Sequence, residues 1–360
     1  MNASADNDAW SGELAITGMG LVTPVGLTAK ATCAALRAGV SRLRTLSALR
    51  LRVAVDEFDD VKGACVPNVT EGLQGPARLK AMMRPALEEA IRDAQLSEER
   101  LAVYLGTSGS RPGGRMMNHD AAVRDNLLDS LPADMTVAQA KLVQSGRTAV
   151  QKSLRLAARA LEEGSIDAAV IGASDSWVSP RALRYLHQQG RLAEYPRHTG
   201  AIPAEAAGFL VVEPAQRAHD RGATVYAVVR ASAGAREAQR WGDPMQGHAL
   251  ARAIRAVRGD TACAHAVVVS DLDGERYRTL EWLMAEGKAM WNYHTMDHWN
   301  PADCVGDSGA AMGAVLLAWA SMALHRNYAG ATDLLLWGAA DEGAREALLM
   351  SRQGGEAHAL

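Results

Sequence analysis

The chain has 360 residues, of which 48% are hydrophobic and 22% charged, and its net charge is −3 at pH 7. This composition is typical of a soluble globular protein, and the length exceeds the usual size of one hydrophobic core, so two domains or two similar halves are expected. Lys and Arg are scattered without a basic block, which gives no electrostatic reason to expect nucleic acid or a membrane surface as a partner.

Targeting and redox signals are weak. The first residues, MNASADNDAWSGE, lack the charged and apolar regions of a signal peptide. No apolar run approaches the roughly 18 residues of a membrane span. The four cysteines have no CxxC spacing, which indicates neither a disulfide framework nor a zinc site; they are Cys33, Cys65, Cys263 and Cys304. We therefore expect a reduced, cytoplasmic protein without a metal or other cofactor.

Strands and helices are predicted to alternate in the first part of the chain. The expected elements are a flexible lead-in over 1–12, a strand over 14–17, a glycine-rich loop over 18–26, a helix capped by Thr28 and closed by Gly39, irregular connections over 41–75, a helix over 76–95 kinked at Pro85, a strand over 101–105, a loop over 111–114, one or two short helices within 120–140, a helix over 145–164, a strand over 166–171 and a tight turn over 172–175. The GxG at Gly18 and Gly20 lacks the later glycine and acidic residue of a dinucleotide site, so we reject that function.

The same alternation continues to the end of the chain. The expected elements are a helix over 179–189, a loop over 190–206, a strand over 208–213, a helical turn over 214–221, a strand over 224–231, a helix over 248–257, a strand over 264–269, a helix over 278–285, an aromatic-rich loop over 290–300, a long helix over 307–325, strands over 333–337 and 346–350, and a loose end from 351.

Two segments repeat across the halves. GSIDAAVIGASD at 164–175 parallels GATDLLLWGAAD at 330–341, and the strands at 102–106 and 266–270 keep nearly the same offset. A common helix-to-strand connection would explain one such match, but the shared offset favours a duplication. Repeated strand–helix–strand units with apolar strands imply two stacked, parallel-rich sheets with helices between and outside them.

Several motifs together resemble the ketosynthase branch of the thiolase superfamily. They are ITGMG with TPVG at 16–26, AEAAG through LVVE to RGA within 204–223, and GDSGAAMGAV at 306–315. The resemblance covers most of residues 13–350. It implies an α/β fold with a duplicated thiolase-like arrangement in five αβαβα layers, divided into halves at 13–213 and 214–350 between flexible termini. It also implies a homodimer or heterodimer formed through a sheet edge.

The resemblance implies that the catalytic residues have been replaced. A condensing enzyme needs a cysteine thiolate at a helix N-terminus and two histidines that stabilise the developing oxyanion. Matching this sequence to the family places Arg147 at the cysteine position, and Asp273 and Asp307 at the two histidine positions. An arginine stays protonated and is no nucleophile. Ser145 is the nearest substitute, although a serine there is more often a helix N-cap.

The substituted residues have complementary charges. We hypothesise that Arg147 pairs with Asp307, with Asp273 or with both, because a cation at the positive end of a helix is unfavourable unless a carboxylate is near. The alternative is an arginine that points into solvent. A separation above about 6 Å from both carboxylates would reject the ion pair.

Three further features have a functional and a structural interpretation. His294 and His298 are four residues apart and could bind a metal, but Pro301 and the surrounding tryptophans favour a loop. Trp291 and Trp299 could anchor a protein partner or simply pack beneath that loop. Finally, the helix over 145–164 has a charged stripe, which a fully buried central helix should lack. The stripe consists of Lys152, Arg155, Arg159 and Glu163.

The sequence therefore predicts a catalytically inactive, ketosynthase-like bacterial protein that acts as a binding or accessory subunit. The context we expect is effector handling in type VI secretion, with a chaperone or an effector as the partner. The alternative is a chain-length-factor-like partner of an active ketosynthase in fatty-acid or polyketide assembly. A third function, an unrelated activity in the old pocket, is disfavoured because the sequence shows no base–nucleophile pair.

Overall fold

The computed structural model describes residues 8–54, 57–96, 100–108, 122, 124–126, 129–131, 135, 137–193, 199–238, 243–258, 265–290 and 295–354. The strands are β1 Asp8–Val22, β2 Arg44–Ala54, β3 Glu57–Gly63, β4 Leu101–Thr107, β5 Val137–Gln144, β6 Ala168–Ser176, β7 Glu205–Pro214, β8 Ala227–Arg236, β9 His265–Ser270, β10 Thr295–Trp299, β11 Asp333–Ala339 and β12 Ala344–Ser351. The helices are α1 Ala29–Arg37, α2 Gly75–Ala94, α4 Ala149–Glu162, α5 Pro180–Gln188, α6 Ala215–Asp220, α7 His248–Arg258, α8 Arg276–Ala289, α9 Ala302–Val305 and α10 Met312–His325, with 3₁₀ turns η1 Gly146–Thr148 and η2 Gly309–Ala311.

Ten of these strands form one hydrogen-bonded sheet in the order β10-β9-β11-β12-β8-β1-β7-β6-β4-β5. From its outer edge inward, the first half pairs β5, β4 and β6 in parallel and then β7 and β1 antiparallel. The second half pairs β10, β9 and β11 in parallel and then β12 and β8 antiparallel. The identical pattern confirms the predicted duplication, whereas the position of the boundary at 213–214 stays a prediction.

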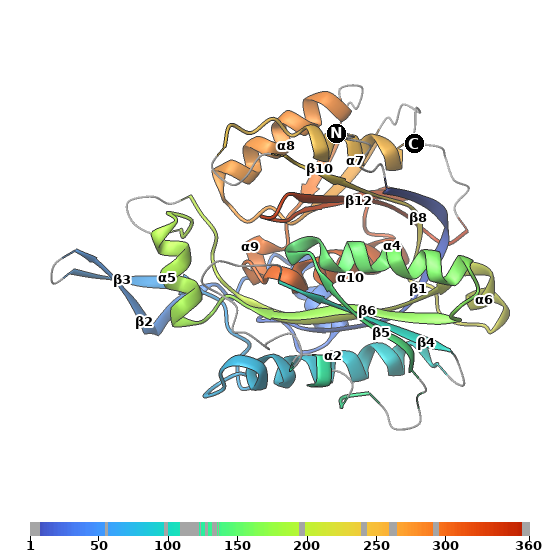
Figure 1. Ribbon diagram of the computed structural model, residues 1–360, viewed down its shortest axis with the longest axis horizontal. Helices are drawn as coiled ribbons and strands as arrows, with labels where there is room; N and C mark the ends of the chain where they lie inside the picture. Colours follow the sequence, from blue (N-terminus) through green and yellow to red (C-terminus); the bar gives the residue numbers. More distant parts are fainter. Residues whose placement is uncertain are drawn as a thin grey trace, which may run out of the picture.

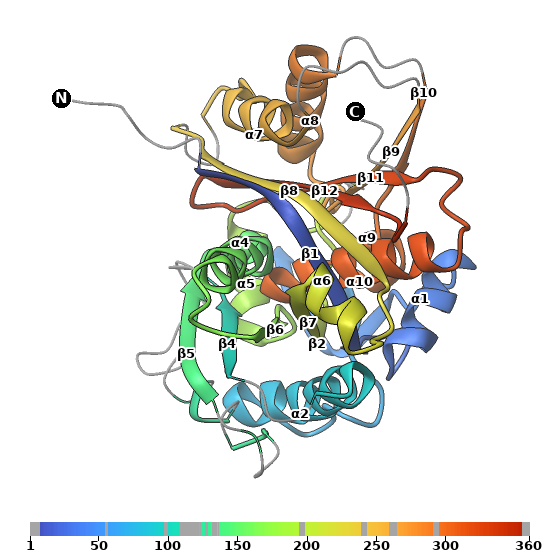
Figure 2. The ribbon, with the colours of Figure 1, turned by 90° about the vertical axis from the view of Figure 1, so that its right-hand side faces the viewer.

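The two halves stack as five layers (Figures 1 and 2). Figure 2 shows α2 below the strands of the first half, α4 and α10 in the middle, and α7 and α8 above the strands of the second half. The buried clusters follow this division: α2 packs on β4, β6 and β7, and α7 and α8 pack on β8, β9, β11 and β12. The α/β fold with αβαβα layers is therefore confirmed.

The middle layer explains the composition of α10. All its residues before His325 are buried, because sheet strands lie on both sides of it. A helix that is apolar all round is the expected sequence for such a position. Its counterpart α4 has the same length of 14 residues, and a 3₁₀ turn precedes each of the two helices.

Two of the three glycines predicted to shape a loop after the first strand, Gly18 and Gly20, instead lie within β1, and only Gly26 lies in a turn. A Cβ on Gly18 would be 2.3 Å from the Ala90 carbonyl oxygen, and one on Gly20 would be 1.9 Å from the Ala86 oxygen. Both glycines therefore let the backbone of α2 approach the sheet closely. The loop prediction is correct only for residues 23–26, because packing, rather than a turn, requires Gly18 and Gly20.

Several other boundaries differ from the prediction. Residues 172–175 continue β6, because they pair with β7 instead of turning. Irregular or helical segments were predicted where the structure has the β2–β3 hairpin, β5 and β10. The flexible lead-in was predicted to extend to residue 12, but β1 already begins at Asp8. The loose C-terminal end was predicted to begin at 351, but β12 includes Ser351. Edge strands and hairpins bury few side chains, and so they leave little apolar periodicity in the sequence.

We expect Gly20→Ala to lower the free energy of unfolding by about 2–3 kcal/mol, because the new methyl group overlaps the α2 backbone. Urea unfolding followed by circular dichroism would measure the change. Gly287→Ala is the matched control: a Cβ there has nothing within 4 Å, and the residue lies in helix α8. That substitution should leave stability unchanged or raise it by up to about 1 kcal/mol. Equal effects of the two substitutions would contradict the close β1–α2 packing.

Candidate functional site: a buried charge cluster where two helices begin

The N-terminal ends of the two middle-layer helices meet in the interior. Arg147 lies in η1, directly before α4, and Asp307 precedes η2 and α10. Asp273 follows β9, in the connection to α8. All three are buried, with exposed fractions of 3% for Arg147, 1% for Asp307 and 8% for Asp273. The fold thus brings together three residues that are far apart in the sequence.

The predicted ion pair is confirmed with both aspartates. The Arg147 guanidinium lies 2.6 Å from Oδ2 of Asp273 and donates a hydrogen bond to Oδ2 of Asp307. The second oxygen of each carboxylate accepts a backbone N–H, from Gly309 at 2.9 Å for Asp307 and from Glu275 at 3.1 Å for Asp273. These bonds fix both carboxylates, and their charge offsets the cost of burying a cation near a helix N-terminus.

Two more buried arginines extend the cluster. Arg278 lies 2.7 Å from Asp271 and also donates to the Ala339 carbonyl. Arg191 makes two hydrogen bonds to Glu275, at 2.6 and 3.0 Å, and two to Asp341, at 2.7 and 3.2 Å. We define the charge cluster as these eight residues: Arg147, Arg191, Arg278, Asp271, Asp273, Glu275, Asp307 and Asp341. Sequence analysis found only Arg147, Asp273 and Asp307, because nothing local in the chain pairs the others.

The charge cluster contains five carboxylates and three guanidinium groups, and this excess shapes its titration. Burial alone would raise the pKa of Asp273, but Arg147 and Arg278 outweigh it and lower that pKa. Glu275 behaves differently: burial and the neighbouring Asp273 raise its pKa to about 8, in spite of Arg191. Burial lowers the pKa of Arg147, but Asp307 and Asp273 more than compensate, so the guanidinium stays charged.

Ser145, the predicted substitute nucleophile, lies just before the start of α4. Ser145 is buried, and its hydroxyl bonds to the Thr148 hydroxyl at 2.9 Å. It occupies the N-cap position of η1, but its side chain accepts no capping N–H. The predicted N-cap role is thus correct in position only. Arg147 itself donates hydrogen bonds to anions and cannot attack a carbonyl carbon.

The structure does contain a serine–histidine contact that the sequence did not reveal. Nε2 of His298 lies 2.7 Å from Oγ of Ser270, which also bonds to Oδ1 of Asn300 at 2.6 Å. Ser270 is completely buried, and His298 packs edge-on against Trp282. Burial lowers the pKa of His298 to about 4, so its imidazole is neutral at pH 7. Because no face of Ser270 is exposed, we interpret this pair as a structural contact between β9 and β10.

The other candidate features are structural where the chain is described. His294 and Trp291 lie outside the described residues, so the paired-histidine metal site and one of the two proposed anchors have no structural test. Trp299 stacks on Trp319 with ring centroids 5.0 Å apart, which confirms the packing interpretation for Trp299. On the charged stripe of α4, Arg155 is buried and pairs with Glu346 of β12.

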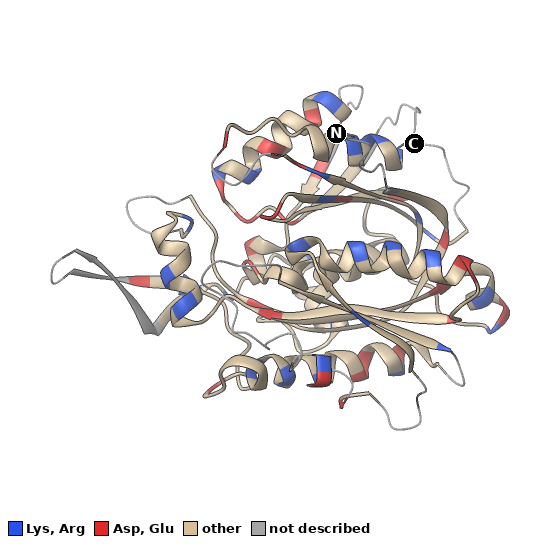
Figure 3. Cartoon of the chain, in the orientation of Figure 1, with Lys and Arg blue, Asp and Glu red and all other residues tan. Residues whose placement is uncertain are grey.

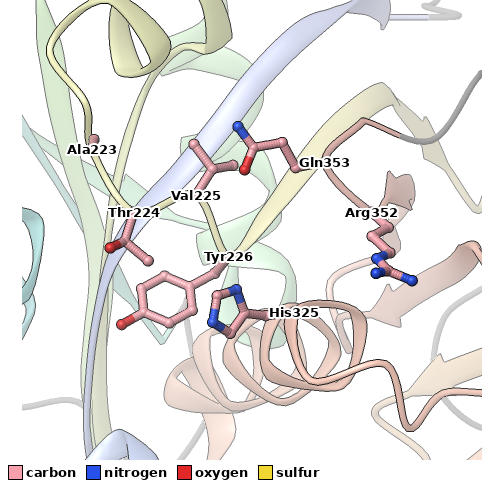
Figure 4. A pocket seen from close by; sticks show the side chains of 7 residues that line it. All are labelled: Ala223, Thr224, Val225, Tyr226, His325, Arg352 and Gln353. Carbon is pink, nitrogen blue, oxygen red and sulfur yellow. The ribbon is translucent and has the colours of Figure 1, made fainter.

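A small pocket lies at the opposite end of α10 from the charge cluster. It has a volume of about 260 Å³ and is formed by residues 223–226, His325, Arg352 and Gln353 (Figure 4). Tyr226 donates a hydrogen bond to Asp93 at 2.8 Å, and its ring lies 5.0 Å from that of His325. Since His325 ends α10 and Arg147 lies where that helix begins, this pocket gives no access to Arg147.

In the described part of the chain, no helix has the length and apolarity needed to cross a bilayer.

Comparisons with known proteins identify ketosynthase-like relatives. The chain is 26% identical over 310 residues to a polyketide beta-ketoacyl synthase of Streptomyces cyaneus, covering 72% of this chain and 71% of that protein. It is also 34% identical over 87 residues to a polyketide synthase of Bacillus subtilis, and this match covers 22% of this chain and 2% of that much longer protein. No protein-family model matches the chain.

Solved structures with the same fold are ketosynthases. A type II polyketide acyl-carrier protein in complex with its ketosynthase matches with a TM-score of 0.75 at 17% identity, over 95% of this chain and 100% of that one. The ishigamide ketosynthase/chain length factor matches with a TM-score of 0.76 at 17% sequence identity, and the match covers 96% of this chain and 100% of that one. A beta-ketoacyl synthase from Burkholderia phymatum matches with a TM-score of 0.75 at 18% sequence identity, and the match covers 95% of this chain and 99% of that one. The fold is therefore that of the ketosynthases.

We expect Arg147→Ala to lower the free energy of unfolding by about 3–5 kcal/mol, because it removes the cation paired with two buried carboxylates. Chemical denaturation at pH 7 would measure the loss. Arg100→Ala is the control, since Arg100 pairs with Asp167 at 2.7 Å on the surface, and its loss should cost at most about 1 kcal/mol. Similar losses for both variants would contradict a stabilising role for the buried pair.

A pH dependence follows from Glu275. Its pKa rises from 4.5 when unfolded to about 8 when folded, so the folded protein binds more protons between those values. The free energy of unfolding should therefore fall as pH rises from about 4.5 to 8, by up to about 1.4 kcal/mol per pH unit, and should level off above pH 8. Denaturation midpoints measured between about pH 5 and 9 would show this fall and its end near pH 8. Glu275→Gln should flatten the profile over that range, and an unchanged profile would contradict the assignment to Glu275.

Proposed function

We propose that this protein is a catalytically silent ketosynthase-like subunit that pairs with an active ketosynthase, in the manner of a chain length factor. One observation carries the proposal: the start of α4 holds Arg147 in a buried ion pair with Asp273 and Asp307. By the family resemblance, these three residues stand where a cysteine and two histidines would stand. Their convergence in space supports that assignment, since the three come from different parts of the chain.

The chemistry of the charge cluster argues against condensation. A guanidinium cannot form an acyl-enzyme bond, because it stays protonated and carries no free electron pair for attack. Asp307 accepts hydrogen bonds from Arg147 and the Gly309 N–H, and Asp273 pairs with Arg147 and accepts the Glu275 N–H. An ionised carboxylate has no proton to donate to a developing oxyanion.

The edge of the sheet in the described part of the chain supports a role in pairing with another protein. Strand β5 forms one edge of the large sheet and pairs only with β4 among the described strands. Ala138 and Ala140 of this strand are exposed. An edge strand with open N–H and C=O groups can pair with a strand of a second chain. Among the structural neighbours, one is a ketosynthase with its chain length factor and another is a ketosynthase with its acyl-carrier protein.

The relatives favour this function over a role in type VI secretion. The comparisons described above name polyketide and beta-ketoacyl synthases. Nothing in the structure or in these relatives points to a secretion chaperone or effector as the partner, so the chain-length-factor-like function has the better support.

Co-expression with ketosynthases encoded in the same genome tests the pairing. We expect a stable heterodimer with one of them, detected by affinity purification followed by size-exclusion chromatography. Ala138→Lys with Ala140→Lys should abolish it, because charges on an edge strand prevent further strand pairing. Ala34→Lys, at an exposed position on α1, is the control and should leave it intact. A complex that resists the β5 substitutions, or co-purification with secretion proteins alone, would contradict the proposal.

A further inference from the structure

The outer face of α8 exposes an apolar stripe, which we define as Leu280, Leu283 and Met284. Their exposed fractions are 41%, 56% and 42%. The spacing i, i+3 and i+4 places all three on one side of the helix. Only two other large apolar side chains are comparably exposed in the described part of the chain, Leu27 and Val40. Single exposed apolar residues are ordinary, but three adjoining ones on a helix indicate a contact surface.

The folding of this chain does not require the apolar stripe. The opposite side of α8 is buried, with Trp282, Ala285 and Ala289 packed in the cluster that includes α7 and the sheet. The helix would therefore be held by its inner face alone. Beyond the stripe, Gly287 is exposed and leaves the surface open, since a Cβ there would meet nothing within 4 Å.

The two outer helices also carry basic residues, which we call the basic rim; Figure 3 shows Lys and Arg positions on both α7 and α8. We define the rim as Arg252 and Arg255 of α7 with Arg276 and Lys288 of α8. The three arginines are exposed and Lys288 is half-buried. Their recorded hydrogen bonds go to backbone carbonyls, for example from Lys288 to Gln246 and from Arg255 to Lys288. Where the chain is described, none of the four has a carboxylate within ion-pair distance.

Few acidic residues lie on this surface. Of the described carboxylates on or near α8, Glu275 and Glu281 are buried and paired with Arg191 and Arg345. Glu286 is partly exposed, and the exposed Asp243 lies near Tyr277 at the start of α8, which gives two acidic side chains against the four basic ones of the rim. The outer layer is thus locally basic, although the whole chain has a net charge of −3. A charge pattern opposite to the overall balance points to recognition of an anionic partner.

We propose that the outer face of α7 and α8 binds an amphipathic helix of an acidic protein partner. The apolar side of that helix would cover Leu280, Leu283 and Met284, and its acidic flanks would pair with the basic rim. The face from 276 to 287 is about 16 Å long, which matches three turns of a docked helix. Ion pairs at the edge of such a contact favour the correct partner and speed association, while the apolar centre supplies most of the affinity.

Two other occupants fit the surface less well. A symmetric dimer of this chain would place the basic rim of one copy against that of the other, and these like charges would repel. A membrane-bound helix needs a broader apolar face than three side chains within two turns. The proposal goes beyond the silent-subunit function, because it uses neither the charge cluster nor the β5 edge. If the protein proved to be catalytically active, or to have no ketosynthase partner, the proposal for the face of α7 and α8 would be unaffected.

Fluorescence anisotropy with designed peptides tests the proposal. The probe is a labelled helical peptide of about 18 residues, with leucines along one face and glutamates elsewhere. A second peptide has lysine in place of each glutamate. We expect the acidic peptide to bind at least about tenfold more tightly and to weaken as salt is added. Leu283→Ser with Met284→Ser, and separately Arg252→Glu with Arg255→Glu, should each weaken binding by about tenfold or more. Leu27→Ser, at an exposed site on another surface, should have no effect.

Several results would overturn the proposal. Equal binding of the two peptides, absence of binding, or binding that survives the Leu283 and Met284 substitutions would show that the face does not recognise an acidic helix. A dimer in sedimentation velocity that Leu283→Ser abolishes would assign the face to a second copy of this chain. Binding to phosphatidylglycerol vesicles, with no preference for the acidic peptide, would assign it to a membrane surface. Circular dichroism of each variant would confirm that it is folded.

Discussion

The ion pair of Arg147 with Asp273 and Asp307 joins the two halves of the molecule in the buried interior. It connects the start of α4 in the first half with the end of β9 and the start of α10 in the second. A buried guanidinium without a carboxylate would be strongly unfavourable, and the same is true of each carboxylate without the guanidinium. The three residues therefore depend on one another, and with them the arrangement of the two middle-layer helices.

The duplication explains why the charges meet there. In each half a 3₁₀ turn leads into a 14-residue helix that crosses between the sheets. The two turns contact each other, so their helix dipoles point positive ends into one small volume. The excess of carboxylates in the charge cluster matches this field. A scaffold that concentrates positive potential suits a thiolate, and it equally suits a network of aspartates and glutamates around arginines.

The sequence predicted the parts of the molecule that repeat or that bury one side. The helices α1, α5 and α7 match their predicted ranges closely, because Thr28, Ser179-Pro180 and regular apolar spacing mark them. The ion pair of Arg147 was also predicted, because the three positions matched to the family carry one cation and two anions. Arg191, Arg278 and Asp341 were not, because only the folded chain brings their side chains together. The edge strands β5 and β10 and the β2–β3 hairpin were missed for lack of a buried face.

Loss of condensation chemistry is the central claim, and the decarboxylation of a malonyl thioester tests it most directly. Carbon dioxide release from radiolabelled malonyl-acyl carrier protein can be measured with the pure wild-type chain, an Arg147→Ala variant and a protein-free blank. The account predicts that the wild-type protein releases no more than the blank and forms no acyl-enzyme detectable by mass spectrometry. Turnover by the wild-type chain, or an acyl group on any of its side chains that Ser145→Ala removes, would contradict it.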